Sequence, residues 1–348
     1  MMDSLAHAAS TAKPRLIITT DIGGDPDDQQ SMIRLMTHAN EFEIEALIAS
    51  ACGTPDDNKG DITRPDLIRE IVEAYGAVQP NLSQHADGYP AADWLLRRIY
   101  SGNPCRGVAH LGDGHDTEGS RAIIAAVDRA DARPVHIAIW GGSTDLAQAL
   151  WRVRNDRSED QLRQFVSRLR VHAISHQDDT GPWIVDHFPD LFYVLNMQSE
   201  GRDKRDSAYR GMYLGGDESL TAREWIDAHV RVGHGPLGAL YPAKAWTAPN
   251  PHSCLKEGDT PSWFFFLSNG LQDSEHPEWG GWGGRYERAA GGLFRDARDV
   301  VDGVCDSRAT VWRWRPAFQN QSDAIVTSPS ESIMGITPRF VRAGITSS

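Results

Sequence analysis

The sequence predicts an α/β fold with a mostly parallel, doubly wound sheet and long Gly/Trp-rich loops in the second half. In the first half, short apolar and β-branched runs alternate with segments of helical periodicity, as in strands that alternate with helices. The predicted strands are near-continuous apolar runs, which is typical of parallel strands covered on both faces. Seven of the eleven tryptophans fall at or after Trp225, where clear helical periods are fewer.

The elements of the first half follow in order. Residues 15–20 are apolar and β-branched and predict a buried strand, and apolar residues at helical spacing in 29–39 predict the helix after it. A second helix is expected to have Thr63 as N-cap, because Pro65 suits the first turn and Asp66 completes a capping box. The other predicted elements are strands at 43–49, 134–140, 169–174 and 191–195 and helices at 118–130 and 145–153.

The predicted domain organisation is simple. Residues 14–318 are expected to form the α/β domain, between a disordered N-terminal segment at 1–13 and a poorly ordered, Ser- and Thr-rich tail at 319–348. In parallel sheets of this kind, ligands bind in the crevice beyond the C-terminal ends of the strands. Residues that directly follow predicted strands are therefore the candidates for chemistry.

Composition restricts the class of protein. The chain has 348 residues and a net charge of −13, which disfavours a nucleic-acid-binding protein and favours metal cations as ligands. No apolar segment approaches the about 20 residues of a membrane helix, so no membrane partner is expected. The N-terminus lacks the regions of a signal peptide, so we expect a cytoplasmic location for the chain as it stands, and secretion only if the N-terminus is truncated. Four dispersed cysteines predict reduced thiols, with two long-range disulfides as the alternative in an exported protein.

The strongest chemical feature is an Asp-rich turn directly after the first predicted strand. The segment T-T-D-I-G-G-D-P-D-D contains four carboxylates, those of Asp21, Asp25, Asp27 and Asp28. Like charges this close repel one another, and a bound cation relieves the repulsion. Carboxylate oxygens favour a hard cation, Ca²⁺ or Mg²⁺, over zinc. The alternative is an ordinary turn in which Asp27 or Asp28 is the N-cap of the helix.

This segment resembles the N-terminal fingerprint of the inosine–uridine-preferring nucleoside hydrolases, a strand followed by D-x-D-x-G-x-D-D. It is more similar still to a branch named for a cellulose-binding protein with a nucleoside-hydrolase-like domain. The resemblance covers roughly residues 14–318 and implies a sheet of nucleoside-hydrolase type. Two departures stand out: the gap from Asp21 to the Asp27–Asp28 pair is two residues longer, and Thr19 replaces the first Asp. Metal binding therefore transfers from the resemblance better than substrate choice does.

Two later segments support the resemblance. W-G-G-S-T-D-L-A at 140–147 is similar to the family motif G-P-L-T-N-L-A, in which a threonine carbonyl binds calcium, and Ser143 or Thr144 is also expected to cap the next helix. E-G-D-T-P-S-W at 257–263 resembles the segment that supplies the distal carboxylate, although its aspartate alone would read as a turn residue. The resemblance thus implies a Ca²⁺ site formed by Asp21, Asp28, Thr144 and Asp259.

The implied chemistry is cleavage at an anomeric carbon. N-glycosidic cleavage passes through an oxocarbenium-like state, and a metal lowers the pKa of a water and orients it. Asp21, expected to touch both metal and water, is the predicted catalytic general base. Asp27 is expected to hydrogen-bond a sugar hydroxyl. Asp25 has no counterpart in the shorter hydrolase motif.

Further substrate-binding residues are expected around this turn. His176 and Asp178 follow a predicted strand and are candidates to contact the sugar or the base, with a structural or charge-paired histidine as the alternative. Trp183 and Trp263 are expected walls of the pocket, although packing is the default role of any one tryptophan. Asn58 is a candidate for the sugar-contacting asparagine that nucleoside hydrolases place after the second strand.

Two functions from different classes fit these features. One is a calcium-dependent hydrolase that cleaves N-glycosidic (ribonucleoside-like) or related glycosidic bonds of a small-molecule nucleoside or glycoside, with Asp21 activating a metal-bound water. The other is a non-catalytic carbohydrate- or cellulose-binding protein on the same scaffold, which the altered spacing and the Trp-rich second half favour. A phosphatase with a D-x-D nucleophile is disfavoured because residue 23 is glycine. The resemblance also implies that a homo-oligomer is common.

Overall fold

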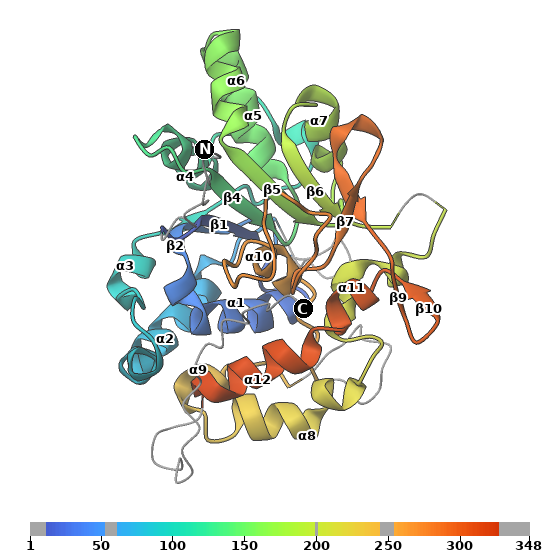
Figure 1. Ribbon diagram of the computed structural model, residues 1–348. Coiled ribbons are helices and arrows are strands. Elements are labelled where there is room, and N and C mark those ends of the chain that lie inside the picture. The colour runs from blue at the N-terminus through green and yellow to red at the C-terminus, as the bar shows by residue number, and fades with distance from the viewer. Residues whose placement is uncertain (1–11, 53–60, 199–200, 244–253, 327–348) are drawn as a thin grey trace, which may run out of the picture.

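A central sheet organises the protein. The structure, a computed structural model, describes residues 12–52, 61–198, 201–243 and 254–326. The strands of the sheet are β1 Arg15–Thr20, β2 Glu43–Ala49, β3 Ile99–Ser101, β4 Val135–Ile139, β5 Leu169–Ile174, β6 Phe192–Asn196, β7 Tyr286–Arg288 and β8 Phe294–Asp296. They form an eight-stranded sheet in the order β3-β2-β1-β4-β5-β6-β8-β7 (Figure 1). All neighbours pair in parallel except β7 and β8, which are antiparallel.

Strand β1 lies at the point where the order of strands reverses. From β1 the chain continues outward to β2 and β3, and it then returns to add β4 on the other side of β1. Crevices at such a reversal are where α/β sheets bind ligands, beyond the C-terminal ends of the strands. The fold therefore directs attention to the residues that follow β1 and β4.

Helices cover both faces of the sheet, as Figure 1 shows. One face is covered by α1 Asp27–Thr37, α2 Pro65–His85, α10 Thr260–Phe264 and α12 Arg315–Val326, and the other by α4 Glu118–Asp128, α5 Thr144–Asp156, α6 Glu159–Ser167 and α7 Thr180–His187. Leu16 and Ile18 of β1 pack into the core of the first face, and Ile17 packs into the core of the second. This alternation confirms the predicted α/β class with a mostly parallel sheet covered on two sides.

The predicted elements are confirmed with small shifts, and one helix start is wrong. Strands β1, β2 and β5 have the predicted bounds. The helix expected to have Thr63 as N-cap begins at Pro65, with Arg64 in the N-cap position and no side-chain cap bond. A residue before proline is driven out of the helical region, and Arg64 has φ −122° and ψ 59°. Asp66 therefore binds the Arg64 guanidinium (2.7 Å) and forms no capping box.

The second half contains short elements joined by long ordered segments, as predicted. Its remaining α-helices are α8 Arg223–Ile226, α9 Gly235–Ala239 and α11 Ala309–Trp312, and the first half has one more, α3 Ala92–Leu96. A separate two-stranded sheet is formed by β9 Asp299–Val301 and β10 Val304–Asp306. In the Gly/Trp-rich loop, a Cβ on Gly283 would collide with the backbone of Pro261 and Phe265, so glycine permits the loop to pack on α10. The tail expected from residue 319 is helical to Val326, because α12 continues through it.

Two global expectations are also answered. All four cysteines are free, as the reduced-thiol prediction required. Among the described residues, every helix is too short or too polar to cross a bilayer.

Truncating the centre of β1 is expected to destabilise the protein strongly. Leu16 is fully buried, so Leu16→Ala removes apolar contacts and leaves a cavity, and it should lower the free energy of unfolding by about 3 kcal/mol. Val232 is 69% exposed, so Val232→Ala should change the unfolding free energy by no more than about 0.5 kcal/mol. Urea unfolding followed by circular dichroism measures both, and equal midpoints for the two variants would contradict the assigned core.

Candidate metal centre

The candidate site lies where β1 ends, at the C-terminal edge of the sheet. Asp21 directly follows β1, and Asp27 and Asp28 begin α1. Thr20 fixes this turn, because its hydroxyl donates to Asp28 and accepts from the main-chain amide two residues later (3.2 Å). Gly141, just after β4, leaves room for Asp21, since a Cβ there would lie 2.6 Å from the Asp21 carboxyl carbon. The N-cap position of α1 is occupied by the preceding proline, so neither Asp27 nor Asp28 is the N-cap.

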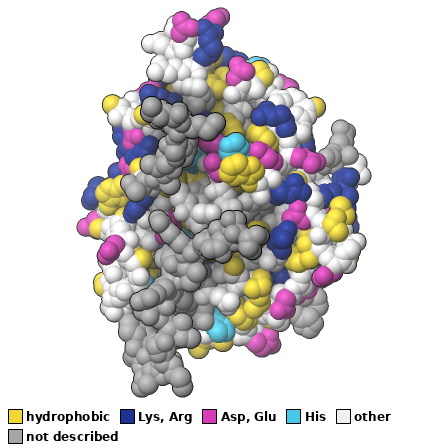
Figure 2. All heavy atoms as spheres, in the orientation of Figure 1, with side chains coloured by type: hydrophobic (Ala, Val, Ile, Leu, Met, Phe, Trp, Pro, Cys, Tyr) yellow, Lys and Arg dark blue, Asp and Glu magenta, His cyan; other side chains and the backbone are white. Residues whose placement is uncertain are grey.

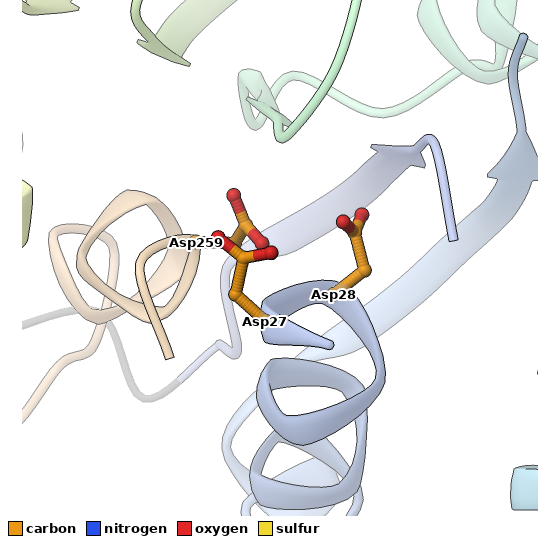
Figure 3. Close-up of side chains that lie close together, drawn as sticks. All are labelled: Asp27, Asp28 and Asp259. Atoms are coloured by element: carbon orange, nitrogen blue, oxygen red, sulfur yellow. The ribbon is translucent and has the colours of Figure 1, made fainter. Parts of the chain in front are cut away.

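Asp259 joins Asp27 and Asp28 to form what we call the acidic cluster. The carboxylate oxygens of the three residues lie within 4.8 Å of one another, and Figure 3 shows Asp27 and Asp259 close together between two helices. Asp259 directly precedes α10, which is docked on α1 by a hydrogen bond from Thr260 to Ser31 (3.1 Å). The structure thus brings together the predicted ligands Asp28 and Asp259 and adds Asp27, which was expected to bind the sugar.

The acidic cluster fits a divalent cation. Asp28 and Asp259 are 4% and 2% exposed, and Asp259 Oδ2 is buried with no hydrogen-bond partner in the described part of the chain. A buried, unpartnered carboxylate oxygen is costly, and a bound cation removes that cost. All the donors are carboxylate oxygens, which suit Ca²⁺ or Mg²⁺.

Burial and mutual repulsion raise the pKa of each carboxyl in the acidic cluster. Burial is the largest cause for all three, and neighbouring carboxylates add to it. The pKa of Asp27 rises to about 7, and those of Asp28 and Asp259 rise well above the usual range. Burial also raises the pKa of Asp21, against an opposing effect of the Arg106 guanidinium. Without a cation, the acidic cluster cannot hold its full negative charge at neutral pH.

Two cationic side chains of the protein lie against these carboxylates. Arg106, from the loop between β3 and α4, has Nη2 2.5 Å from Asp21 Oδ2. Lys256 pairs with Asp25, and its Nζ is 3.9 Å from Asp27 Oδ2. Burial lowers the pKa of Lys256 to about 8. The sequence carries no local sign of either contact, because each pair joins segments that are distant along the chain.

Thr144 and Asp178 are bound to each other and to neighbouring loops. The Thr144 hydroxyl donates to Asp178 Oδ2 (3.0 Å) and accepts from the Gly107 amide (3.1 Å). Asp178 Oδ1 accepts from the Thr180 amide (3.0 Å) at the start of α7. The bonds of Asp178 therefore tie two loops together and do not support the predicted substrate contact. Ser143 occupies the N-cap position of α5 without a side-chain cap bond, and the Thr144 carbonyl remains a predicted metal ligand.

His176 is placed at the same edge of the sheet, just after β5. Burial, and then the charge of Arg295, lower its pKa to about 4, so the ring is neutral at pH 7. Its Nε2 is buried and has no hydrogen-bond partner among the residues described. Its predicted contact with a substrate remains a prediction.

The two predicted aromatic walls lie in different surroundings, and the pocket role of Trp183 remains a prediction. Trp263 is fully buried and packs against Phe42 (6.1 Å between ring centroids) and Phe264 (4.5 Å). The prediction for Trp263 is wrong because α10 turns this ring into the core under the sheet. Trp183 lies on α7 and stacks on His187 (4.5 Å), in the outer layer of helices. Asn58 lies outside the described residues.

Comparisons with known proteins agree with this fold. Residues 15–286 match the family described as cellulose-binding Sde182, nucleoside hydrolase-like domain. A nucleoside hydrolase-related hypothetical protein from Saccharophagus degradans, associated with carbohydrate metabolism, is 32% identical over 91% of this chain and 73% of its own, with a TM-score of 0.72. The effector protein XOO4466 is 10% identical over 91% of this chain and 95% of its own, with a TM-score of 0.50.

The inosine–uridine preferring nucleoside hydrolase from Bacillus anthracis is 12% identical over 90% of this chain and 100% of its own, with a TM-score of 0.48. Comparison with curated proteins gives no match. The sheet order and the acidic edge define an α/β protein of nucleoside-hydrolase type. The chain belongs to the nucleoside hydrolase-like family described as cellulose-binding Sde182.

Without metal, stability is expected to fall as the pH rises toward neutrality. Because the pKa values are raised, the folded state binds more protons than the unfolded state above the ordinary value of 3.8, and the unfolding free energy then decreases with pH. For Asp27 this window ends at about 7, and the raised pKa values of Asp28 and Asp259 act in the same direction. Thermal unfolding at several pH values should show this fall in excess chelator and a weaker fall in millimolar Ca²⁺. Identical profiles under both conditions would exclude metal binding at the acidic cluster.

Asp259→Asn is expected to weaken calcium binding while stabilising the metal-free protein. The change removes one ligand and one of the buried charges that repel each other, so calcium affinity should fall at least about 10-fold. Asp296→Asn is the matched control, because Asp296 is also buried with its pKa raised to about 7 but lies on β8, outside the acidic cluster. Calorimetric titration with Ca²⁺ compares the two variants, and unchanged affinity in Asp259→Asn would refute the ligand assignment.

Proposed function

We propose that this protein is a calcium-dependent hydrolase that cleaves N-glycosidic or related glycosidic bonds of a small-molecule nucleoside or glycoside. The observation that carries the proposal is Asp259, which lies with Asp27 and Asp28 at the C-terminal edge of the sheet and has a buried oxygen without a hydrogen-bond partner among the described residues. Burying these like charges together costs free energy that packing alone does not offset, whereas a bound metal ion offsets it. The net charge of −13 likewise argues against nucleic acid as the substrate.

Asp28 and Asp259 would hold the ion, together with Asp21 and the Thr144 carbonyl. Several carboxylates together with a main-chain carbonyl are typical Ca²⁺ ligands, whereas Mg²⁺ usually keeps several waters and takes only one or two carboxylates. When bound, the ion supplies Lewis-acid chemistry, which lowers the pKa of a water and orients sugar hydroxyls.

The protein side chains would carry the proton transfers and the orientation of the sugar. Asp21 accepts a proton from the attacking water as the new C–O bond forms at the anomeric carbon. The glycosidic bond breaks, and the leaving group departs with its electron pair and takes up a proton. Asp27 accepts a hydrogen bond from a sugar hydroxyl. His176, neutral at pH 7, offers one donor and one acceptor to the substrate.

A non-catalytic carbohydrate-binding protein is the second candidate. The observation that favours it is the ion pair of Asp21 with Arg106, which engages one oxygen of the expected base within the protein. The family description, cellulose-binding, and the link of the Saccharophagus relative to carbohydrate metabolism support a sugar ligand for both candidates.

Asp21→Asn separates the two candidates. Loss of a general base lowers rates by about 10²- to 10⁴-fold, so Asp21→Asn should reduce product release by that factor. Release is measured over a panel of nucleosides and aryl glycosides, with Ca²⁺ and with excess chelator. Asp190→Asn, at an exposed position of the loop before β6, is the control and should match the wild type. Calcium-dependent sugar binding without release by the wild type would favour the binding protein.

A further inference from the structure

Arg106 is buried against the expected catalytic base. Its Nη2 lies 2.5 Å from Asp21 Oδ2 and 3.2 Å from the Ala51 carbonyl oxygen, and the Arg106 and Asp21 side chains are 14% and 9% exposed. Its Nε is buried without a hydrogen-bond partner among the described residues. A buried ion pair seldom adds net stability over an apolar pair of the same size, because both charges lose their hydration. Stability is therefore a weak explanation for this arginine.

The loop that carries Arg106 is anchored on both sides of it. Four main-chain amides of residues 103–112 donate to side chains at the start of α5 or in the loop before α7. The pairs are Asn103 with Asp145 (2.9 Å), Gly107 with Thr144 (3.1 Å), Val108 with Asp179 (2.8 Å) and Gly112 with Gln148 (2.8 Å). The loop turns at Gly107, where φ is +101°, a value that favours glycine. The anchored backbone of this loop thus places Arg106 next to Asp21.

Asp21 lies between Arg106 and the acidic cluster. Its Oδ2 accepts a hydrogen bond from the Arg106 guanidinium, and its charge adds to the rise in the pKa of Asp27 and Asp28. Gly141 leaves the space that the carboxyl group occupies, since a Cβ there would lie 2.6 Å from its carbon. Asp21 therefore interacts with Arg106 through one oxygen and with the acidic cluster through its charge.

We propose that Arg106 is a positioning residue for Asp21: it holds one carboxylate oxygen, so that Asp21 presents only the other oxygen to the metal and to water. The proposal rests on the metal-dependent hydrolase proposed above. The same guanidinium has a second effect, because its fixed positive charge beside the acidic cluster repels a divalent cation. Arg106 thereby lowers the affinity for the metal ion and fixes the orientation of Asp21.

Arg106→Met tests the metal effect, with Arg15→Met as the matched control. Arg15 is 1% exposed and pairs with Glu45 (2.6 Å), but it lies at the opposite end of β1 from Asp21. Titration with Ca²⁺ alone should give Arg106→Met an affinity about 10-fold tighter than wild type, because the lost repulsion outweighs the lost orientation. The rise in melting temperature on adding Ca²⁺ should be larger for Arg106→Met than for wild type. Arg15→Met should have a lower melting temperature than wild type. Its calcium affinity, and the rise in its melting temperature on adding Ca²⁺, should equal those of wild type.

Release kinetics test the orientation effect. In saturating Ca²⁺, Arg106→Met should lower kcat by about 10- to 100-fold with KM unchanged, as expected when only the orientation of a base is lost. Arg106→Lys keeps the charge without the planar fork, and it should keep the wild-type calcium affinity while lowering kcat. If Arg106→Met does not fold, the kcat of Arg106→Lys tests whether Arg106 positions Asp21.

The outcomes separate this proposal from the one on which it rests. Equal calcium affinity in wild type and Arg106→Met, or no calcium binding by either, overturns the positioning role. An unchanged kcat in both Arg106 variants also overturns it. If the wild type releases no product but Arg106→Met binds Ca²⁺ more tightly, the hydrolase proposal fails while the control of metal affinity by Arg106 stands.

Discussion

The repulsion among buried carboxylates at the end of β1 is the constraint on which the rest of the structure depends. Burial raises the pKa of Asp21, Asp27, Asp28 and Asp259, and neighbouring carboxylates raise it further in the last three. A protein can tolerate such an arrangement only with compensating cations or protons. This one supplies the cations Arg106 and Lys256 from its own chain.

The site is assembled by a polar contact between two segments far apart in sequence. The segment before α10 docks on α1, because the Lys256 amide donates to Gln30 (2.7 Å) and the Arg34 guanidinium holds Glu257 (3.0 Å) in a fully buried pair. The same arginine binds Gln319 of α12 (2.7 Å). Asp259 reaches the acidic cluster as a consequence of this docking, so the acidic cluster and the packing of α12 depend on the same contacts.

The side chains around the site divide into those that face the acidic cluster and those that hold the loops. Thr144 and Asp178 belong to the second kind, since their hydroxyl and carboxylate groups anchor the loop of Arg106 and the start of α7. A sequence motif identifies where such residues lie along the chain, but their partners depend on which loops meet at the edge of the sheet. These side chains therefore bind neighbouring loops, while the Thr144 carbonyl ligand and the substrate contact of Asp178 remain predictions.

The sequence by itself determined the α/β class, the bounds of β1, β2 and β5, and the acidic turn after β1. These features are local: buried parallel strands are continuous apolar runs, and four aspartates within eight residues need no tertiary information to be noticed. Only the tertiary structure decided that Arg106 pairs with Asp21, that Lys256 pairs with Asp25, and that Trp263 lies in the core. The physical reason is that these outcomes depend on long-range packing, because an ion pair or a buried ring is defined by what the fold places next to it.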